Sequence, residues 1–132
     1  MQQFQVRTGG RTQLIDITAE VQDAVSRLGV GEGIATVFVP HTTAGVTINE
    51  NADPDVVHDI LKVVDAIIPL NDPGYRHMEG NSAAHIKSSL FGCSLNVIVE
   101  NGRLQLGTWQ GIYFAEFDGP RTRKVWVGAS QI

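Results

Sequence analysis

The stretch Leu95-Asn-Val-Ile-Val-Glu-Asn-Gly-Arg-Leu-Gln-Leu106 decides the fold class. Leu95, Val97 and Val99 alternate with other residues, as in a strand with one buried face. Asn101-Gly102 is a strong signal for a two-residue hairpin turn, because both residue types tolerate the positive φ that this turn needs. Leu104 and Leu106 continue the alternation on the returning strand. The stretch therefore predicts an antiparallel hairpin.

Further strands are expected on both sides of this hairpin. Residues 112–117 and 125–127 flank Asp118-Gly119-Pro120, and we expect them to pair with each other. Near the N-terminus, residues 3–6 and 12–18 flank Gly9-Gly10 and also predict a hairpin. Two more strands are predicted by the β-branched run 33–39, which Pro40 ends, and by the alternating residues 46–49.

Three segments predict helices. Residues 18–28 carry apolar side chains at helical spacing, and Gly29 ends the segment. Asp53-Pro54 is typical of an N-cap followed by proline in the first turn, and the helix should run to about residue 68. Its apolar face is wide, so we expect it to be covered on more than one side. Asn81 or Ser82 can cap a last helix that ends at Gly92.

About eight strands and three helices make this an α+β protein with one domain, residues 1–132. We expect a large, mostly antiparallel sheet, twisted or barrel-like and built from hairpins, with about three helices packed on it. A ferredoxin-like order is the alternative, but the four C-terminal strands exceed it.

Composition limits the possible partners. The chain has a net charge of −4, and its only dense basic run, Arg121 to Lys124, is expected at a hairpin tip. A nucleic-acid partner is therefore not expected. No apolar stretch reaches the roughly 18 residues of a membrane span, and no signal peptide is expected. Cys93 is the only cysteine, which fits a reducing cytoplasm, and we expect it to be a small buried filler.

The first polar cluster is His41-Thr-Thr-Ala-Gly-Val-Thr-Ile-Asn-Glu-Asn-Ala-Asp53. Local roles explain part of it, since Asp53 caps the following helix and Asn49 and Asn51 can bind loop amides. Glu50 and His41 are less well explained. His41 follows Pro40 at the end of a strand, which predicts a position on the rim of the fold.

The second cluster leads from Tyr75 into the last predicted helix. It contains Arg76, His77, Glu79, Asn81, His85 and Lys87. The N-terminal end of a helix attracts anions, and the basic side chains would add charge. A solvated loop with capping residues is the alternative.

His41, His77 and His85 together could bind a divalent metal and leave one position open, as zinc sites do. No H-x-x-x-H or C-x-x-C spacing supports a metal. The same imidazoles could instead bind phosphate or transfer protons near neutral pH.

The third cluster is Gly107-Thr108-Trp109-Gln110-Gly111, between two predicted strands. The glycines permit a bend or a close backbone approach. Trp109 could cover an aromatic ligand and Gln110 could bind its polar edge. A bulge with Trp109 in the core is the alternative.

Taken together and in order, these clusters resemble the YjbQ-like proteins, a family of secondary thiamine-phosphate synthases. The resemblance spans nearly the whole chain and rests on the following motifs: His41-Thr-Thr-Ala-Gly45, Asn49-Glu-Asn-Ala-Asp-Pro54, Tyr75-Arg-His77, Glu79-Gly-Asn81, Ala84-His-Ile-Lys-Ser88 and Gly107-Thr-Trp-Gln110.

The resemblance implies an α+β fold that assembles as a homotrimer, with the polar clusters in a pocket near subunit contacts. It also implies a weak or secondary activity that joins hydroxymethylpyrimidine pyrophosphate to thiazole phosphate and releases pyrophosphate. His41, His77, His85 and Glu50 are then expected to be catalytic. The expected substrate-binding residues are Asn49, Asn51, Asp53, Arg76, Glu79, Asn81, Lys87, Thr108, Trp109 and Gln110.

Two other functions fit the same residues. One is a metal-dependent hydrolase or lyase of a small phosphorylated metabolite, with zinc at the histidines. Magnesium bound with pyrophosphate is the other divalent ion that the chemistry suggests. The second function is a non-catalytic module that binds a phosphorylated ligand.

Overall fold

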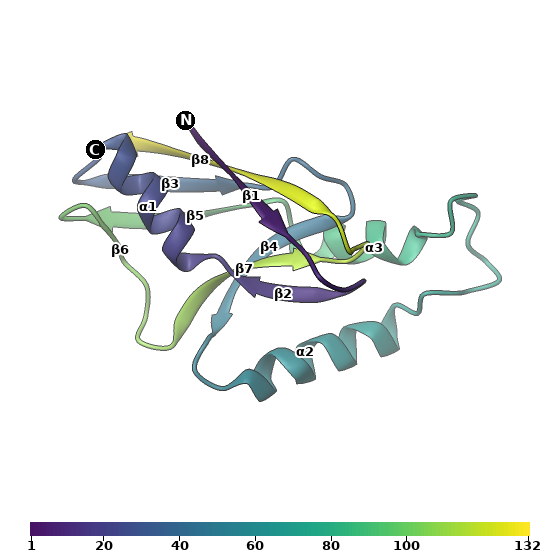
Figure 1. The fold of residues 1–132 in the computed structure, drawn as a ribbon. Coiled ribbons are helices and arrows are strands. Elements are labelled where there is room, and N and C mark those ends of the chain that lie inside the picture. Colours follow the sequence, from purple (N-terminus) through teal and green to yellow (C-terminus); the bar gives the residue numbers. More distant parts are fainter.

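Two antiparallel sheets and three helices make up the fold in a computed structural model that describes residues 1–132 (Figure 1). The strands are β1 (Gln2–Arg7), β2 (Gln13–Asp16), β3 (Gly33–Phe38), β4 (Ala44–Glu50), β5 (Ser94–Glu100), β6 (Arg103–Leu104), β7 (Gln110–Glu116) and β8 (Thr122–Gln131). The helices are α1 (Thr18–Leu28), α2 (Pro54–Ile67) and α3 (Ser82–Phe91).

The five-stranded sheet has the order β1-β8-β3-β5-β6, and the three-stranded sheet has the order β2-β7-β4. All pairings are antiparallel. The predicted α+β class, with helices on a curled antiparallel sheet, is confirmed. The hairpin at Asn101-Gly102 is confirmed too, because Val99 pairs with Leu104 and Glu100 with Arg103.

The other two predicted hairpins are wrong. β1 pairs with β8 rather than with β2, and β7 pairs with β2 and β4 rather than with β8. In each case the connecting turn carries the chain from one sheet into the other. At the first turn the Thr8 backbone N–H donates to the Arg121 carbonyl, 2.9 Å away, which extends the pairing of β1 with β8 by one residue before the chain enters the other sheet. A turn signal marks where a strand ends, but it does not fix the next partner.

The sheets face each other across the main core. That core contains α1 and the inner residues of both sheets, among them Val21, Val37, Phe114 and Val127. The second face of the three-stranded sheet carries Tyr113, Ala115 and Phe117, against which α2 and α3 pack. β7 is therefore covered on both faces, and Gly111 to Phe117 are all buried.

α2 is covered less than its sequence predicts. Asp53 caps it as expected, since its Oδ1 accepts from the Asp55 N–H at 2.9 Å. Within the chain, however, no α2 residue is fully buried, and Val63 and Ile67 remain 57% and 68% exposed. The helix lies along one edge of the molecule (Figure 1). Neither α2 nor another helix is both long and apolar enough to cross a membrane.

A buried ion pair joins the two sheets next to the turn that leads from β7 to β8. Glu116 of β7 and Arg123 of β8 are 0% and 3% exposed. Arg123 Nε donates to Glu116 Oε2 at 2.8 Å, and Nη2 donates to Oε1 at 2.5 Å. Burial by itself would raise the pKa of Glu116, but the bonds and charge of Arg123, with donors from Asp118 and Thr8, lower it. Glu116 is therefore ionised at neutral pH.

Glu116→Leu leaves the Arg123 charge buried without its counter-ion. We expect the free energy of unfolding to fall by about 3–5 kcal/mol, because an unpaired buried charge is strongly destabilising. Urea unfolding at one fixed protein concentration measures this. The matched control is Glu116→Leu/Arg123→Met, which removes both charges and should be less destabilised. A double variant as unstable as the single one would show that the pairing is not what matters.

Candidate functional site

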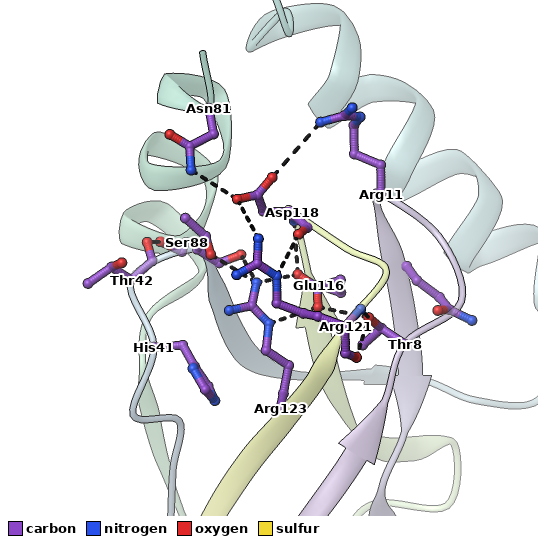
Figure 2. A network of polar contacts seen from close by, with 12 residues as sticks. Thr8, Arg11, His41, Thr42, Asn81, Ser88, Glu116, Asp118, Arg121 and Arg123 are labelled. Carbon is purple, nitrogen blue, oxygen red and sulfur yellow. Dashed lines mark hydrogen bonds and ion pairs between the residues drawn. The ribbon is translucent and has the colours of Figure 1, made fainter. Parts of the chain in front are cut away.

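The loop that carries His41 joins β3 to β4 and is fixed at each of its polar residues. Pro40 has no N–H and ends β3. His41 Nε2 accepts a hydrogen bond from the Lys124 backbone N–H at 2.9 Å. The Thr42 carbonyl accepts from Ser88 Oγ of α3 at 2.5 Å, and Thr43 Oγ1 contacts Arg123 Nη2 at 2.9 Å. Figure 2 shows this loop beside Arg123 and Glu116.

A hollow of about 380 Å³ lies between this loop and α3. Its polar lining includes His41, His85, Ser89 and Cys93. Gly45 lets the end of α3 approach, because a Cβ there would lie 2.6 Å from the Gly92 carbonyl oxygen. Two of the three predicted histidines, His41 and His85, therefore line one hollow although they are far apart in the sequence, and His77 does not line it.

A second hollow, of about 410 Å³, lies on the N-terminal side of α3. Its lining includes Arg76, His77, Ser82 and His85. The His77 and His85 rings meet edge to face, with centroids 5.2 Å apart. Glu79 Oε1 lies 3.9 Å from His77 Nε2. His85 therefore borders both hollows, and it connects the other two predicted histidines.

The electrostatics of the first hollow depend on Arg123. Burial lowers the pKa of His41, and the charge of Arg123 lowers it further. The His41 ring is therefore neutral at neutral pH. No group of three or more His, Cys, Asp or Glu side chains lies within metal-binding distance of one another.

Asn81 and Lys87 point to a different side of α3. Both line a hollow of about 350 Å³ between α2 and α3. Asn81 Nδ2 donates to Asp118 Oδ2 at 2.9 Å, and Lys87 Nζ donates to Asp65 Oδ1 at 2.5 Å. The Lys87 charge is thus paired with Asp65 rather than directed toward the histidines.

The remaining predicted residues form what we call the distal cluster: Asn49, Glu50, Asn51, Thr108, Trp109 and Gln110. The Asn51 N–H donates to the Trp109 carbonyl at 2.9 Å, and Gln110 pairs with Glu50 in the sheet. Trp109 is 63% exposed, so it is not a core residue. The first and third polar clusters therefore meet. They meet at the Glu50 end of β4, whereas His41 precedes the Ala44 end. The length of the strand puts about 20 Å between the two ends.

Sequence reasoning missed Glu116 and Arg123. The signal was present, because Arg123 shares the inward-facing parity of Val125 and Val127, and Glu116 shares that of Ile112 and Phe114. Arg123 was instead expected at a hairpin tip. The expectation for Cys93 was also wrong. Cys93 is exposed and lines the hollow of His41. Its backbone carbonyl accepts a hydrogen bond from the Val39 N–H at the start of the His41 loop.

The fold and this site define a small α+β protein with a histidine-lined surface centred on α3. Residues 2–131 match the family model described as UPF0047 protein YjbQ-like. The chain belongs to this family.

Known relatives cover nearly the whole chain. It is 57% identical over 124 residues to the UPF0047 protein YugU of Bacillus subtilis, and the matched region covers 94% of each protein. It is 56% identical over 124 residues to a UPF0047 protein of Methanocaldococcus jannaschii, covering 94% of this chain and 89% of the relative.

Solved structures confirm the fold. An uncharacterized YjbQ/UPF0047 protein of Clostridium acetobutylicum superimposes with a TM-score of 0.96 at 57% identity, over 98% of this chain and 100% of the other. A conserved hypothetical protein of Thermus thermophilus gives 0.92 at 44% identity, over 98% and 100%.

Cys93 provides a test of whether pyrophosphate binds in the hollow of His41 and His85. We expect inorganic pyrophosphate to slow alkylation of Cys93 by iodoacetamide, because a ligand in the hollow of His41 and His85 covers the thiol. Mass spectrometry measures the rate without ambiguity, since Cys93 is the only cysteine. Sodium chloride at equal ionic strength controls for screening. Equal rates with and without pyrophosphate would contradict binding in this hollow.

Proposed function

We propose that the protein is a weak or secondary thiamine-phosphate synthase-type transferase. In this reaction the bond between the pyrimidine methylene carbon and the pyrophosphate oxygen breaks, and pyrophosphate leaves with the electron pair. The thiazole nitrogen of thiazole phosphate then forms a bond to that carbon. The products are thiamine phosphate and pyrophosphate, so atoms and charges balance without a further reactant.

The position of His85 carries this proposal. It borders two adjoining hollows on α3, so a substrate with two anionic phosphoryl groups can occupy both. Arg76 supplies positive charge in one of them, and the N-terminal turn of α3 contains no acidic residue. Donors and positive charge placed beforehand around a leaving group stabilise the charge that develops on it.

The distal cluster supports the heterocycle side of the reaction. The exposed Trp109 ring can stack on the cationic pyrimidine intermediate, and Glu50 can balance its charge. These residues lie at the far end of β4 from His41, and none of them lines either hollow that His85 borders. We propose that they act with it across a contact between copies of the chain.

A divalent ion is a separate part of the proposal. Zinc at His41, His77 and His85 does not fit the side chains as they lie, because no three ligands converge and His41 Nε2 is already bonded. Magnesium would be held mainly by pyrophosphate oxygens, with Glu50 or Asp53 of a neighbouring copy as carboxylate ligands.

Activity is tested with the two substrates, by measuring thiamine phosphate and released pyrophosphate. We expect His41→Ala, His77→Ala and His85→Ala each to lower the rate by about 100-fold or more, as loss of charge-stabilising groups does. The melting temperature should fall by only a few degrees. His58→Ala is the matched control, because the His58 side chain is 70% exposed on α2.

Each other result identifies a different function. Wild-type protein that forms no thiamine phosphate contradicts the transferase. Bound zinc near one per chain, with hydrolysis of a phosphorylated metabolite, would favour the metal-dependent hydrolase or lyase. A substrate that stays bound and unchanged would favour the binding module.

We also propose that the chain forms a homotrimer. Two apolar surfaces are open in the single chain. One is the stripe of α2 with Val63 and Ile67, and the other is the outer face of the five-stranded sheet, with Phe38 stacked on Trp126 and Ile98 62% exposed. Burial of such faces drives association.

Sedimentation equilibrium should give about three times the chain mass of 14.3 kDa. Ile98→Lys and Ile67→Lys place a charge on each surface in turn. We expect at least one of them to lower the mass, because a buried unpaired charge opposes association. A monomeric wild-type protein would contradict the trimer.

A further inference from the structure

We propose that His41 acts as a neutral hydrogen-bond donor, through Nδ1–H, to an anionic oxygen of the bound ligand. It is then a ligand-binding residue and neither a proton acceptor nor a metal ligand. This inference rests on the proposed function only in its choice of a phosphorylated ligand.

The contact with β8 fixes the tautomer. The Lys124 backbone N–H can only donate, and it donates to His41 Nε2 at 2.9 Å. Nε2 must therefore be the acceptor, and in a neutral imidazole the proton then lies on Nδ1. The Nε2 lone pair is occupied, so it is not free to take a proton from a substrate or to bind a metal.

Arg123 holds both partners of this contact in place. Its Nη2 donates to Thr43, two residues after His41, and the donor Lys124 is the next residue along β8. The guanidinium is itself buried against Glu116. Ser88 fixes the residue between His41 and Thr43 from the side of α3. His41 is thus positioned by three separate contacts to its loop.

The lining of the hollow favours an anionic ligand that accepts a hydrogen bond. None of its residues is Asp or Glu. Ser88 Oγ donates to the carbonyls of Thr42 and His85, and Ser89 Oγ donates to the His85 carbonyl. The serine hydroxyl hydrogens are therefore committed to the backbone. No hydrogen bond within the protein uses His41 Nδ1, so its N–H can donate to a ligand, and the ring of His85 lines the same hollow.

The tautomer is measured directly in protein labelled with ¹⁵N at histidine. Long-range proton–nitrogen correlation near neutral pH distinguishes a protonated from an unprotonated ring nitrogen. We expect His41 to show a protonated Nδ1 and an unprotonated, hydrogen-bonded Nε2. His41→Gln assigns the signals, and the exposed His58 serves as the reference. A protonated Nε2 would overturn the proposal. This measurement needs no substrate, so its outcome is separate from that of the transferase assay.

The donor role is tested by adding inorganic pyrophosphate to the same sample. We expect the His41 Nδ1–H signal to shift while the tautomer is retained. An unchanged His41 at saturating pyrophosphate overturns the donor role, whether or not the protein is a transferase.

Two variants separate binding from loop structure. The amide nitrogen of His41→Asn can occupy the place of Nδ1 and donate, whereas the amide oxygen of His41→Gln can replace Nε2 as the acceptor for Lys124. We expect the Kd for pyrophosphate to rise by about tenfold in His41→Gln, the loss of one hydrogen bond to a charged group, and much less in His41→Asn. The reverse order would contradict the proposal. If either variant fails to fold, the wild-type spectra still decide it.

Discussion

The Glu116–Arg123 ion pair is the constraint on which the rest of the structure depends. The chain passes between the two sheets six times, and the passages after β1, after β3 and after β7 meet at this pair. Thr8 contacts Glu116, Thr43 contacts Arg123, and the pair itself joins β7 to β8. One buried guanidinium and one buried carboxylate therefore hold all three crossings together. Arg123 and Glu116 are bonded to each other and to Thr43 and Thr8, and these bonds offset part of the desolvation of the two charges.

The same pair holds the His41 loop of the candidate site in place. The His41 loop is the crossing after β3, so whatever fixes that crossing also fixes the imidazole. α3 completes the site from the other side, with His85 facing two hollows and Asn81 and Lys87 facing a third. Side chains that are neighbours in the sequence of this 10-residue helix therefore lie on different sides of it. Only those on the His85 side can share a ligand within one chain.

The single chain leaves apolar surface open and its polar residues in two groups. The distal cluster and the histidines lie at opposite ends of β4, while the stripe of α2 and the outer face of the five-stranded sheet carry exposed apolar side chains. Self-association would bury that surface and could bring the two groups together. The low fraction of charged residues, 18%, is consistent with a surface of which part is covered by another copy.

The sequence by itself determined the local features: the Asn101-Gly102 hairpin, the Asp53 cap of α2, the strand and helix segments, and the polar clusters that resemble one family. These depend on residues within a few positions of each other. Tertiary structure alone decided which strands pair, because a Gly-rich turn ends a strand without choosing its partner. It also decided that Arg123 is buried and that His41 accepts from Lys124, 83 residues away. Contacts over such separations depend on packing of the whole chain, which no local pattern records.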